Sequence, residues 1–257
     1  MHDHHGVAAD SAGQPWAGRS FGKTAFAGDD GTAPPELLSA IQRFRERSAD
    51  EAAVVDALRE ARLLIPLVAN LGETGVNDHG VTVDKSAELS IVTVAGPDGR
   101  NVLPVFSSVD AMRRWNPDAR PVPADGIRVA LAAADEGTDL VVLDPTSPTE
   151  FVIRRPALWS IAQSLPWSPS HLDAEVAAEF QESAADEPAV AAVTLTAGDP
   201  DAALRGPELV VQLALQPGLD QSALTQLLER LQTRWAASEL IASRVDSLAV
   251  KLVPASP

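Results

Sequence analysis

The chain has 257 residues, enough for one large domain or two small ones and ample for a hydrophobic core. Hydrophobic residues make up 45% and charged residues 22%, as in soluble globular proteins, but the formal net charge is −16. That charge argues against binding to nucleic acid or to an anionic membrane, because phosphate groups are held by basic surfaces. The absence of cysteine excludes disulfides, thiol catalysis and cysteine-based metal sites.

The sequence predicts neither a targeting segment nor a membrane span. Its first 30 residues lack the basic stretch followed by an apolar run that a signal peptide would show. No segment holds about 18 consecutive apolar residues. We therefore expect a cytoplasmic protein without a membrane-spanning helix.

Residues 1–33 are rich in Gly, Ala, Asp and Ser and lack periodicity, which predicts a mobile tail. Phe21 and Phe26 are large apolar groups in this polar context, so we expect residues 21–31 to dock on the domain that follows. Three histidines also lie close to the start, at His2, His4 and His5. Such a trio in a tail more often binds nothing specific than a transition metal, and we predict no metal site there.

Residues 34–165 predict an α+β fold in which helices cover a mixed β-sheet. The expected order is two helices, three strands, two helices, two strands and one helix. The first helix begins at Pro34-Pro35, and its inward face is formed by Leu37, Leu38, Ile41 and Phe44. The helix over residues 124–136 is expected to bury Ile127, Ala130, Leu131 and Ala134.

Prolines carry several of the strand and turn predictions. In the apolar strand over residues 62–69, Pro66 has no N–H to donate, so we expect a sheet edge or a bulge there. Pro97-Asp98-Gly99 predicts a hairpin turn, because proline restricts φ and glycine supplies positive φ. The segment RWNPDARPVP, residues 114–123, predicts a proline-stiffened connection.

The composition changes after residue 165. Residues 166–188 contain six acidic residues and no basic ones, which predicts an acidic linker with at most a weak helix at 173–182. Residues 189–257 predict a small ββαβ domain with a long helix capped by Asp220. A unit of about 65 residues buries one sheet face under one helix, so we expect it to pack on the first domain or on a copy of itself.

No standard catalytic or cofactor motif is found in the sequence. The patterns GxxxxGK[ST], GxGxxG, HExxH and GxSxG are all missing, and no serine is placed on a strand-to-helix elbow. Neither His79 nor His171 has a partner at metal-ligand spacing. We therefore predict no catalytic residue, no cofactor and no metal ligand.

Arginines cluster between residues 84 and 163 and form the one polar constellation of interest. The guanidinium group binds carboxylate or phosphate in a bidentate manner. The candidate residues for an anion or partner site are therefore Lys85, Arg120, Arg128, Arg154 and Arg155. The alternative is structural: Arg120 and Arg155 pair with Asp144 and neighbouring carbonyls and fasten two proline-containing turns.

Three tryptophans offer flat apolar surfaces, at Trp115, Trp159 and Trp167. We expect them in the core, because a tryptophan at the end of an amphipathic helix is more often buried than part of a ligand platform. The alternative is an interaction surface, if one of them is exposed.

Several short motifs occur in a distinctive order and spacing. They are AFAGDDG (25–31), DKSAE (84–88), DGRNVLPVFSS (98–108), AMRRW (111–115), DARPVP (118–123), VVLDP (141–145), FVIRRPALWSIAQ (151–163) and PWSP (166–169). Together they resemble the SseB family in its actinobacterial form, over about residues 21–170. The remainder is similar to the family's variable carboxy-terminal region. The resemblance implies an α/β domain and carries over no catalytic residue.

Two functions from different classes are compatible with these observations. The first is a non-enzymatic adaptor or regulatory protein that binds a protein partner, indicated by the missing catalytic constellation, the acidic linker and the small second domain. The second is a binding protein or enzyme for a small anionic metabolite, held by the arginines between residues 113 and 155. Self-association through the ββαβ domain is a third alternative, if the strand over residues 247–253 is a free edge.

Overall fold

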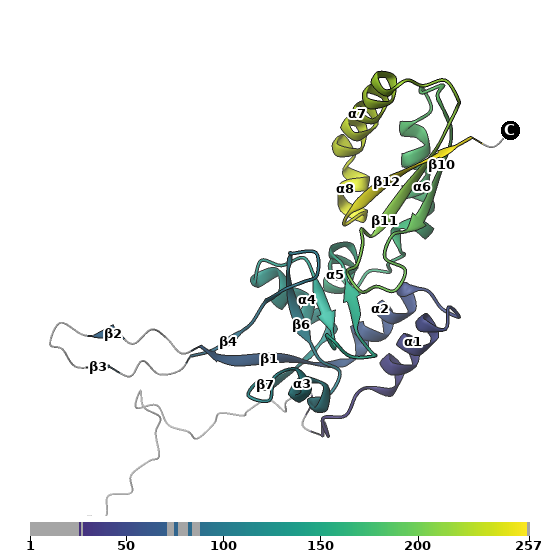
Figure 1. The fold of residues 1–257 in the computed structure, drawn as a ribbon. Coiled ribbons are helices and arrows are strands. Elements are labelled where there is room, and N and C mark those ends of the chain that lie inside the picture. The colour runs from purple at the N-terminus through teal and green to yellow at the C-terminus, as the bar shows by residue number, and fades with distance from the viewer. Residues whose placement is uncertain (1–25, 27, 71–74, 77–81, 84–87, 256–257) are drawn as a thin grey trace, which may run out of the picture. The chain divides into compact units, whose positions relative to one another are not determined.

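The computed structural model describes residues 26, 28–70, 75–76, 82–83 and 88–255 (Figure 1). Residues Gly31–Pro257 form one compact unit. Most of the predicted tail lies outside the described residues, as do Phe21 and Lys85. Helices combine with antiparallel and mixed sheets, which confirms the predicted α+β class.

The amino-terminal region, residues 34–165, places helices against a mixed sheet. Its helices are α1 (Pro35–Arg45), α2 (Glu51–Glu60), α3 (Val109–Trp115), α4 (Gly126–Asp135) and α5 (Arg155–Ala162). Its strands are β1 (Arg62–Asn70), β2 (Gly75–Val76), β3 (Thr82–Val83), β4 (Glu88–Ile91), β5 (Val94–Ala95), β6 (Asn101–Val105), β7 (Arg120–Asp125), β8 (Val141–Leu143) and β9 (Phe151–Ile153). The strand orders are β4-β1-β7, β5-β6-β8-β9 and β2-β3, with β6 and β8 parallel. A bridge between Leu64 and Phe106 joins β1 to the end of β6.

The core of this region combines α1, α2, α4 and α5 with β1, β6, β8 and β9. Leu37, Ile41 and Phe44 face it as predicted, with 0%, 2% and 4% of their surface exposed. The Phe44 ring packs edge-on against Phe151, with centroids 5.2 Å apart. Leu38 is 36% exposed, because it lies about 100° around the helix from Leu37, so its predicted inward position is wrong.

Strand β7 occupies part of the range predicted as a connection, and it pairs antiparallel with β1. Leu64 of β1 donates its N–H to the carbonyl of Phe106 at 2.8 Å, on the side away from β7. The nitrogen of Pro66, two residues further, points to the same side, where β4 begins to pair only at Leu67. Pro66 therefore removes no hydrogen bond between β1 and β7, although β1 is the middle strand of its sheet. The predicted edge or bulge at Pro66 is wrong.

Helix α4 buries Ala130 as predicted and packs Ile127 against the core, but the predicted inward positions of Leu131 and Ala134 are wrong. Its buried residues are Gly126, Val129, Ala130 and Ala133. Leu131 is 52% exposed, and Ala134 is exposed as well. A side chain at Gly126 would bring its Cβ within 2.6 Å of the Leu58 carbonyl oxygen in α2, so the missing side chain permits a close approach there. Apolar residues occur on most sides of α4. The close approach of Gly126 to α2 sets the rotation of the helix and therefore which of these residues face the core.

The carboxy-terminal region, residues 166–255, contains the predicted ββαβ arrangement. Its helical elements are the 3₁₀ helix η1 (Ser170–Leu172), α6 (Ala174–Ser183), α7 (Gln221–Ala237) and α8 (Glu239–Arg244). Its strands are β10 (Val190–Ala197), β11 (Leu209–Leu215) and β12 (Leu248–Pro254), in the order β10-β11-β12. β10 and β11 run antiparallel, and β12 pairs parallel with β11. Asp220 caps α7 as predicted, accepting the N–H of Ala223 at 2.8 Å.

Within the range predicted as an acidic linker, α6 packs against the rest of this region. Val176 and Phe180 are fully buried, and the Phe180 ring lies 5.3 Å from that of Trp235 in α7. The carboxylate of Glu187 pairs with Arg230 of α7 at 2.6 Å. This segment contains six acidic residues and no basic ones, but three of them, Asp173, Glu175 and Glu187, pair with arginines that follow more than 40 residues later in the chain.

The connection between β10 and β11, residues 198–208, reaches the amino-terminal core. Ala202 and Leu204 are 4% and 2% exposed, each within a cluster that includes residues of β6, β8 and β9. The carbonyl of Ala202 accepts the N–H of Val152 in β9 at 2.8 Å. The two regions therefore share buried contacts through the β10–β11 connection.

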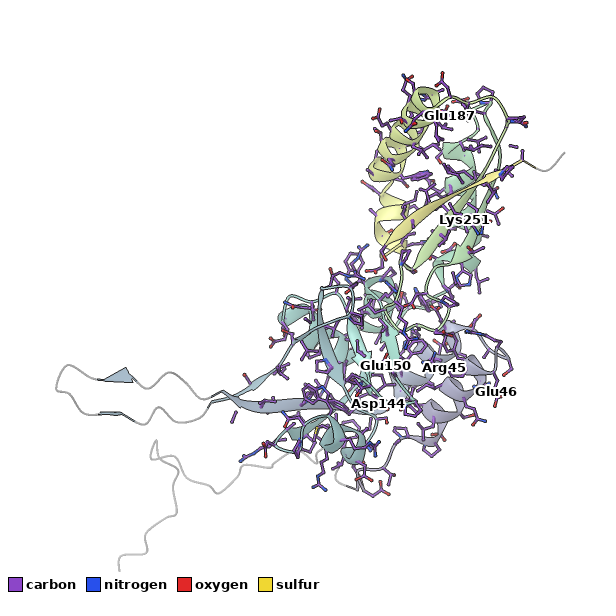
Figure 2. All side chains as sticks on the ribbon, viewed as in Figure 1. Arg45, Glu46, Asp144, Glu150, Glu187 and Lys251 are labelled. Atoms are coloured by element: carbon purple, nitrogen blue, oxygen red, sulfur yellow. The ribbon has the colours of Figure 1, made fainter. Side chains whose placement is uncertain are left out.

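Arginines at the end of α1 hold the same connection. Arg45 donates to the carbonyl of Asp201 at 2.5 Å and also to that of Glu150, which lies beside it (Figure 2). Arg47 pairs with the Asp201 carboxylate at 2.5 Å. The β10–β11 connection is thus attached to α1 as well as to β9.

Candidate functional site

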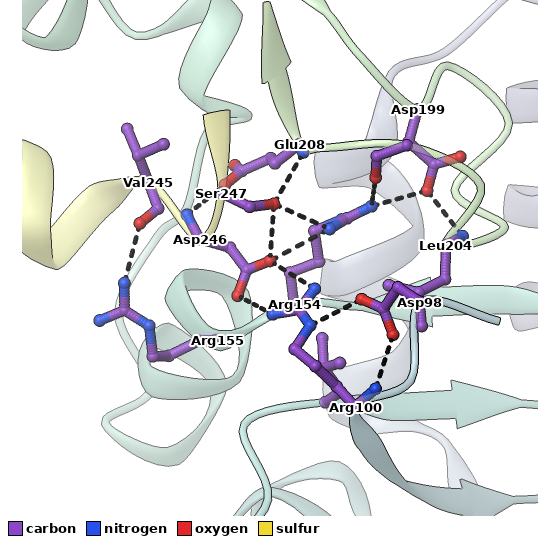
Figure 3. A network of polar contacts seen from close by, with 12 residues as sticks. Asp98, Arg100, Arg154, Arg155, Asp199, Leu204, Glu208, Val245, Asp246 and Ser247 are labelled. Carbon is purple, nitrogen blue, oxygen red and sulfur yellow. Dashed lines mark hydrogen bonds and ion pairs between the residues drawn. The ribbon is translucent and has the colours of Figure 1, made fainter. Parts of the chain in front are cut away.

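A buried ion network lies where the two regions meet, with Arg154 at its centre (Figure 3). Arg154 precedes α5, and its side chain is 8% exposed. Its Nη2 lies 2.8 Å from the carboxylate of Asp199 and its Nη1 lies 3.0 Å from that of Asp246. The carbonyl of Gly206 accepts a further hydrogen bond from Nη2 at 2.9 Å. One guanidinium group therefore ties the start of α5 to the β10–β11 connection and to the residues before β12.

Arg100, in the turn between β5 and β6, approaches the same aspartate. Its two terminal nitrogen atoms each lie 3.0 Å from an oxygen of Asp246, and its Nε lies 2.6 Å from Asp98. Burial alone would raise the pKa of Asp246, but the hydrogen bonds and charges of Arg100 and Arg154 outweigh it and hold that pKa below its usual value. Asp246 therefore stays ionised at neutral pH and bridges two guanidinium groups.

Glu51 and Glu208 add carboxyl groups to the network. Together with Asp199 and Arg154 they line a cavity of about 10 Å³, the space that one water molecule needs. Burial, followed by the negative charge of Glu208, raises the pKa of Glu51 to about 7. Burial also raises the pKa of Glu208, although its carboxylate accepts the N–H of Asp246 at 2.5 Å. The junction thus contains a carboxyl group that changes its charge near neutral pH.

The geometry of this network is better suited to joining the two regions of the chain than to catalysis on a substrate. The cavity is too small for a metabolite, and the guanidinium groups around it are already paired with carboxylates. Among the described residues, no group of three or more His, Asp or Glu side chains is placed to hold a metal ion. In the same part of the chain, no helix is long and apolar enough to cross a membrane.

Arg155, the first residue of α5, points away from the network toward α8 (Figure 3). Its Nη2 donates to the carbonyls of Ala242 and Val245, at 2.9 and 2.8 Å. Its guanidinium also lies over the ring of Trp159, 4.9 Å from the centroid. The adjacent arginines therefore fasten α5 to two different parts of the carboxy-terminal region.

A groove of about 620 Å³, which we call the junction groove, lies beside Trp159 and is lined by both regions. α5 contributes Trp159, the segment that follows contributes Leu165 and Leu172, and α8 contributes Arg244. Trp159, Leu165 and Leu172 are 46%, 49% and 56% exposed. The prediction that Trp159 belongs to the core is therefore wrong. The groove presents large apolar side chains to solvent in a concave surface.

The structure places the predicted site residues in different settings. Arg154 and Arg155 meet at the junction, whereas Arg128 is 71% exposed on α4, with its Nε 3.7 Å from Asp125. Arg120 is exposed on β7, and its side chain has no hydrogen-bond or ion-pair partner among the described residues. Lys85 lies outside those residues.

Asp144, the predicted partner of two arginines, binds hydroxyl groups instead. It is 1% exposed, and its carboxylate accepts the N–H and Oγ–H of Ser107 at 2.8 and 2.6 Å and the hydroxyl of Thr149 at 2.8 Å. These bonds join the end of β6 to the turn between β8 and β9. Arg155 does bind carbonyl groups, but they belong to the end of α8 and the residue after it rather than to neighbouring turns.

Sequence reasoning missed Arg100 and all the acidic members of the network, which are Glu51, Asp98, Asp199, Glu208 and Asp246. Asp199 and Asp246 lie 45 and 92 residues from Arg154 in the chain, so no local pattern connects them. One signal was available: Arg154 directly follows a wholly apolar strand, and a buried guanidinium requires a carboxylate partner.

The fold and this junction define an α+β protein whose two regions are joined by buried ion pairs. The SseB protein N-terminal domain matches residues 36–160, from α1 into α5. The chain belongs to the SseB family, as its motifs indicated. Comparisons with curated proteins and with solved structures find no match. Arg154 and Arg155 lie inside the matched domain, and their partners across the junction lie outside it.

Proposed function

We propose that this SseB-family protein is a non-enzymatic adaptor or regulatory protein that binds a protein partner. The observation that carries the proposal is the junction groove, where Trp159, Leu165 and Leu172 are about half-exposed in one concavity. Large apolar side chains grouped in this way are typical of protein interaction sites, and tryptophan is enriched among the residues that contribute most to binding.

The anion-binding alternative receives less support from the arginines. Arg154 is paired with two carboxylates and Arg155 with two carbonyls, so neither is available to a ligand without breaking those bonds. Arg128 lies near Asp125 and is mostly exposed. Binding of an anion at high affinity requires several donors converging on one site.

A pull-down with the tagged full-length chain from its native host tests the adaptor function. We expect a specific protein to be recovered and to bind the purified chain directly in calorimetry. Recovery of nothing beyond background would contradict the proposal.

A thermal-shift screen with amino acids and phosphorylated metabolites tests the alternative. A ligand at 100 times its dissociation constant would stabilise the fold by about 2.7 kcal/mol. We expect no such shift. A stabilisation that Arg120→Ala abolishes would favour the metabolite-binding function instead.

Self-association stays a prediction of the sequence. β12 lies at an edge of the described sheet, and Leu252 on it is 39% exposed. A free edge strand can pair with a second chain. Light scattering of the full chain measures whether it does.

A further inference from the structure

We propose that the junction groove binds a short segment of the partner protein in which a large apolar side chain is followed or preceded by lysine or arginine residues. This inference rests on the adaptor function proposed above and specifies the chemistry of the partner. Two features of the groove support it: its apolar floor and the excess of carboxylates over guanidinium groups along α6 at its rim.

The apolar floor is already formed in the free protein. The guanidinium of Arg155 lies over the Trp159 ring at 4.9 Å and is itself held by two carbonyls of the carboxy-terminal region, which restricts the orientation of the ring. Leu165 and Leu172 are 49% and 56% exposed in the same groove. A leucine or aromatic side chain placed here would bury all three groups, and a pre-formed surface lowers the entropic cost of binding.

Two arginines lie at the groove: Arg155 is bound by carbonyl groups, whereas Arg244 is already neutralised by carboxylates. Arg244 lies 2.9 Å from the carboxylate of Asp173 and 2.5 Å from that of Glu175. On the same helix, Glu179 and Glu182 have no ion-pair partner among the described residues. Asp173 and Glu175 therefore share the Arg244 guanidinium, and Glu179 and Glu182 add two further carboxylates along α6, so charge complementarity favours a basic partner.

The acidic side chains of α6 share one face of that helix. Glu175, Glu179 and Glu182 are separated by four and three residues, so they line up along the helix, while Val176 and Phe180 point to the core. Glu175 lines the junction groove, so this face starts at the groove and extends about 10 Å along α6. An extended peptide covers that distance in about three residues. Basic residues are therefore expected within about four positions of the apolar anchor.

The same charges argue against other occupants. A phosphate-bearing surface would meet the carboxylates of α6 and be repelled. A second copy of the chain carries a net charge of −16, so it would also bring negative charge to this rim.

The test places a photo-crosslinking amino acid at Leu172 in the full-length chain. A matched control places it at Leu131, which is 52% exposed on α4 and outside the groove. After irradiation in the native host, mass spectrometry identifies the crosslinked segment. We expect crosslinks from position 172 only, to a segment with an aromatic residue, leucine or methionine and at least two basic residues within about four positions.

A synthetic peptide of that segment is then titrated into purified full-length variants. We expect Trp159→Ser and Leu172→Ser each to weaken binding about tenfold. The double variant Glu179→Gln/Glu182→Gln should weaken binding at low salt and reduce its salt dependence. Leu172→Ser keeps the test valid if Trp159→Ser fails to fold, because Leu172 is mostly exposed and its replacement should not disturb the fold.

Several results would overturn the inference: an acidic or uncharged crosslinked segment, crosslinks from position 131 alone, or unchanged affinity in both groove variants. If the full chain captures a partner that does not touch position 172, the adaptor function survives and this inference fails. If no partner is captured at all, both fail.

Discussion

Arg154 and Asp199 lie 2.8 Å apart with side chains only 8% and 4% exposed, although 45 residues separate them in the chain. Removing one partner of such a pair leaves the other charge buried without a counterion, which costs more than the net attraction of the pair. The start of α5 and the β10–β11 connection therefore depend on each other for stability.

Replacement of the central arginine should be strongly destabilising. We expect Arg154→Met to lower the free energy of unfolding by about 3–5 kcal/mol, because it leaves Asp199 buried and removes one of the cations beside Asp246. Urea denaturation followed by circular dichroism measures the change. Arg128→Met is the matched control, since this arginine is 71% exposed, and its effect should stay within about 0.5 kcal/mol. Equal effects in the two variants would contradict a structural role for the network.

The Glu51 carboxyl should make stability depend on pH. Its pKa is about 7 in the folded protein against an ordinary value of 4.5, so between these values the native state binds more protons than the unfolded chain. The contribution of Glu51 is therefore largest below the ordinary pKa and is lost as the pH rises to about 7. The carboxyls of Asp98 and Asp246, whose pKa values are lowered, act below this window.

Glu51→Gln removes this titration. Between about pH 5 and pH 8 we expect the variant to lose less stability than the wild type, by about 1–3 kcal/mol after allowing for partial exposure. Urea denaturation at the two pH values gives the comparison. Glu60→Gln, at the exposed far end of α2, serves as the control. If the free energies of unfolding of the wild type and Glu51→Gln changed equally between the two pH values, the Glu51 carboxyl would have the same pKa in the folded and unfolded states. That result would contradict the prediction.

The β10–β11 connection should not tolerate a side chain at Gly198. A Cβ at this position would lie 2.3 Å from the backbone oxygen of Pro207, which cannot move without shifting the connection that carries Asp199. We expect Gly198→Ala to destabilise the fold by about 1–3 kcal/mol and to speed amide exchange over residues 198–208. At Gly28 an added Cβ meets nothing within 4 Å, so Gly28→Ala should leave both measurements unchanged.

Helix α6 should behave as part of the core and not as a linker. Phe180 is fully buried against Trp235, so Phe180→Ala is expected to cost about 3–5 kcal/mol and to expose residues 166–188 to limited proteolysis. Leu172→Ala, at a side chain that is 56% exposed, should change neither readout. Wild-type stability and proteolysis in Phe180→Ala would indicate that the segment is a linker after all.

Local signals in the sequence predicted much of the fold. The Pro97-Asp98-Gly99 turn forms as expected, with Gly99 at φ 83° and its N–H bonded to the carbonyl of Gly96 at 3.0 Å. The cap at Asp220 and the alternation in β11 likewise depend on neighbours a few residues away. Family membership could also be inferred, because the order and spacing of short motifs can be seen in the sequence without knowledge of the contacts that these residues make.

The sequence by itself determined the α+β class, the ββαβ order and the family, since each follows from short-range periodicity, turn residues or motif spacing. Only the tertiary structure decided which residues of α4 are buried, which acidic residues of 166–188 pair with arginines, and that Arg154 and Arg155 join two regions. The first outcome depends on a close backbone approach at Gly126. The others depend on ion pairs and hydrogen bonds between residues at least 43 positions apart in the chain, which is the separation of Glu187 and Arg230. Long-range pairings of this kind produce no periodic pattern in the sequence, because each partner residue also fits the local pattern of the helix, strand or turn in which it lies.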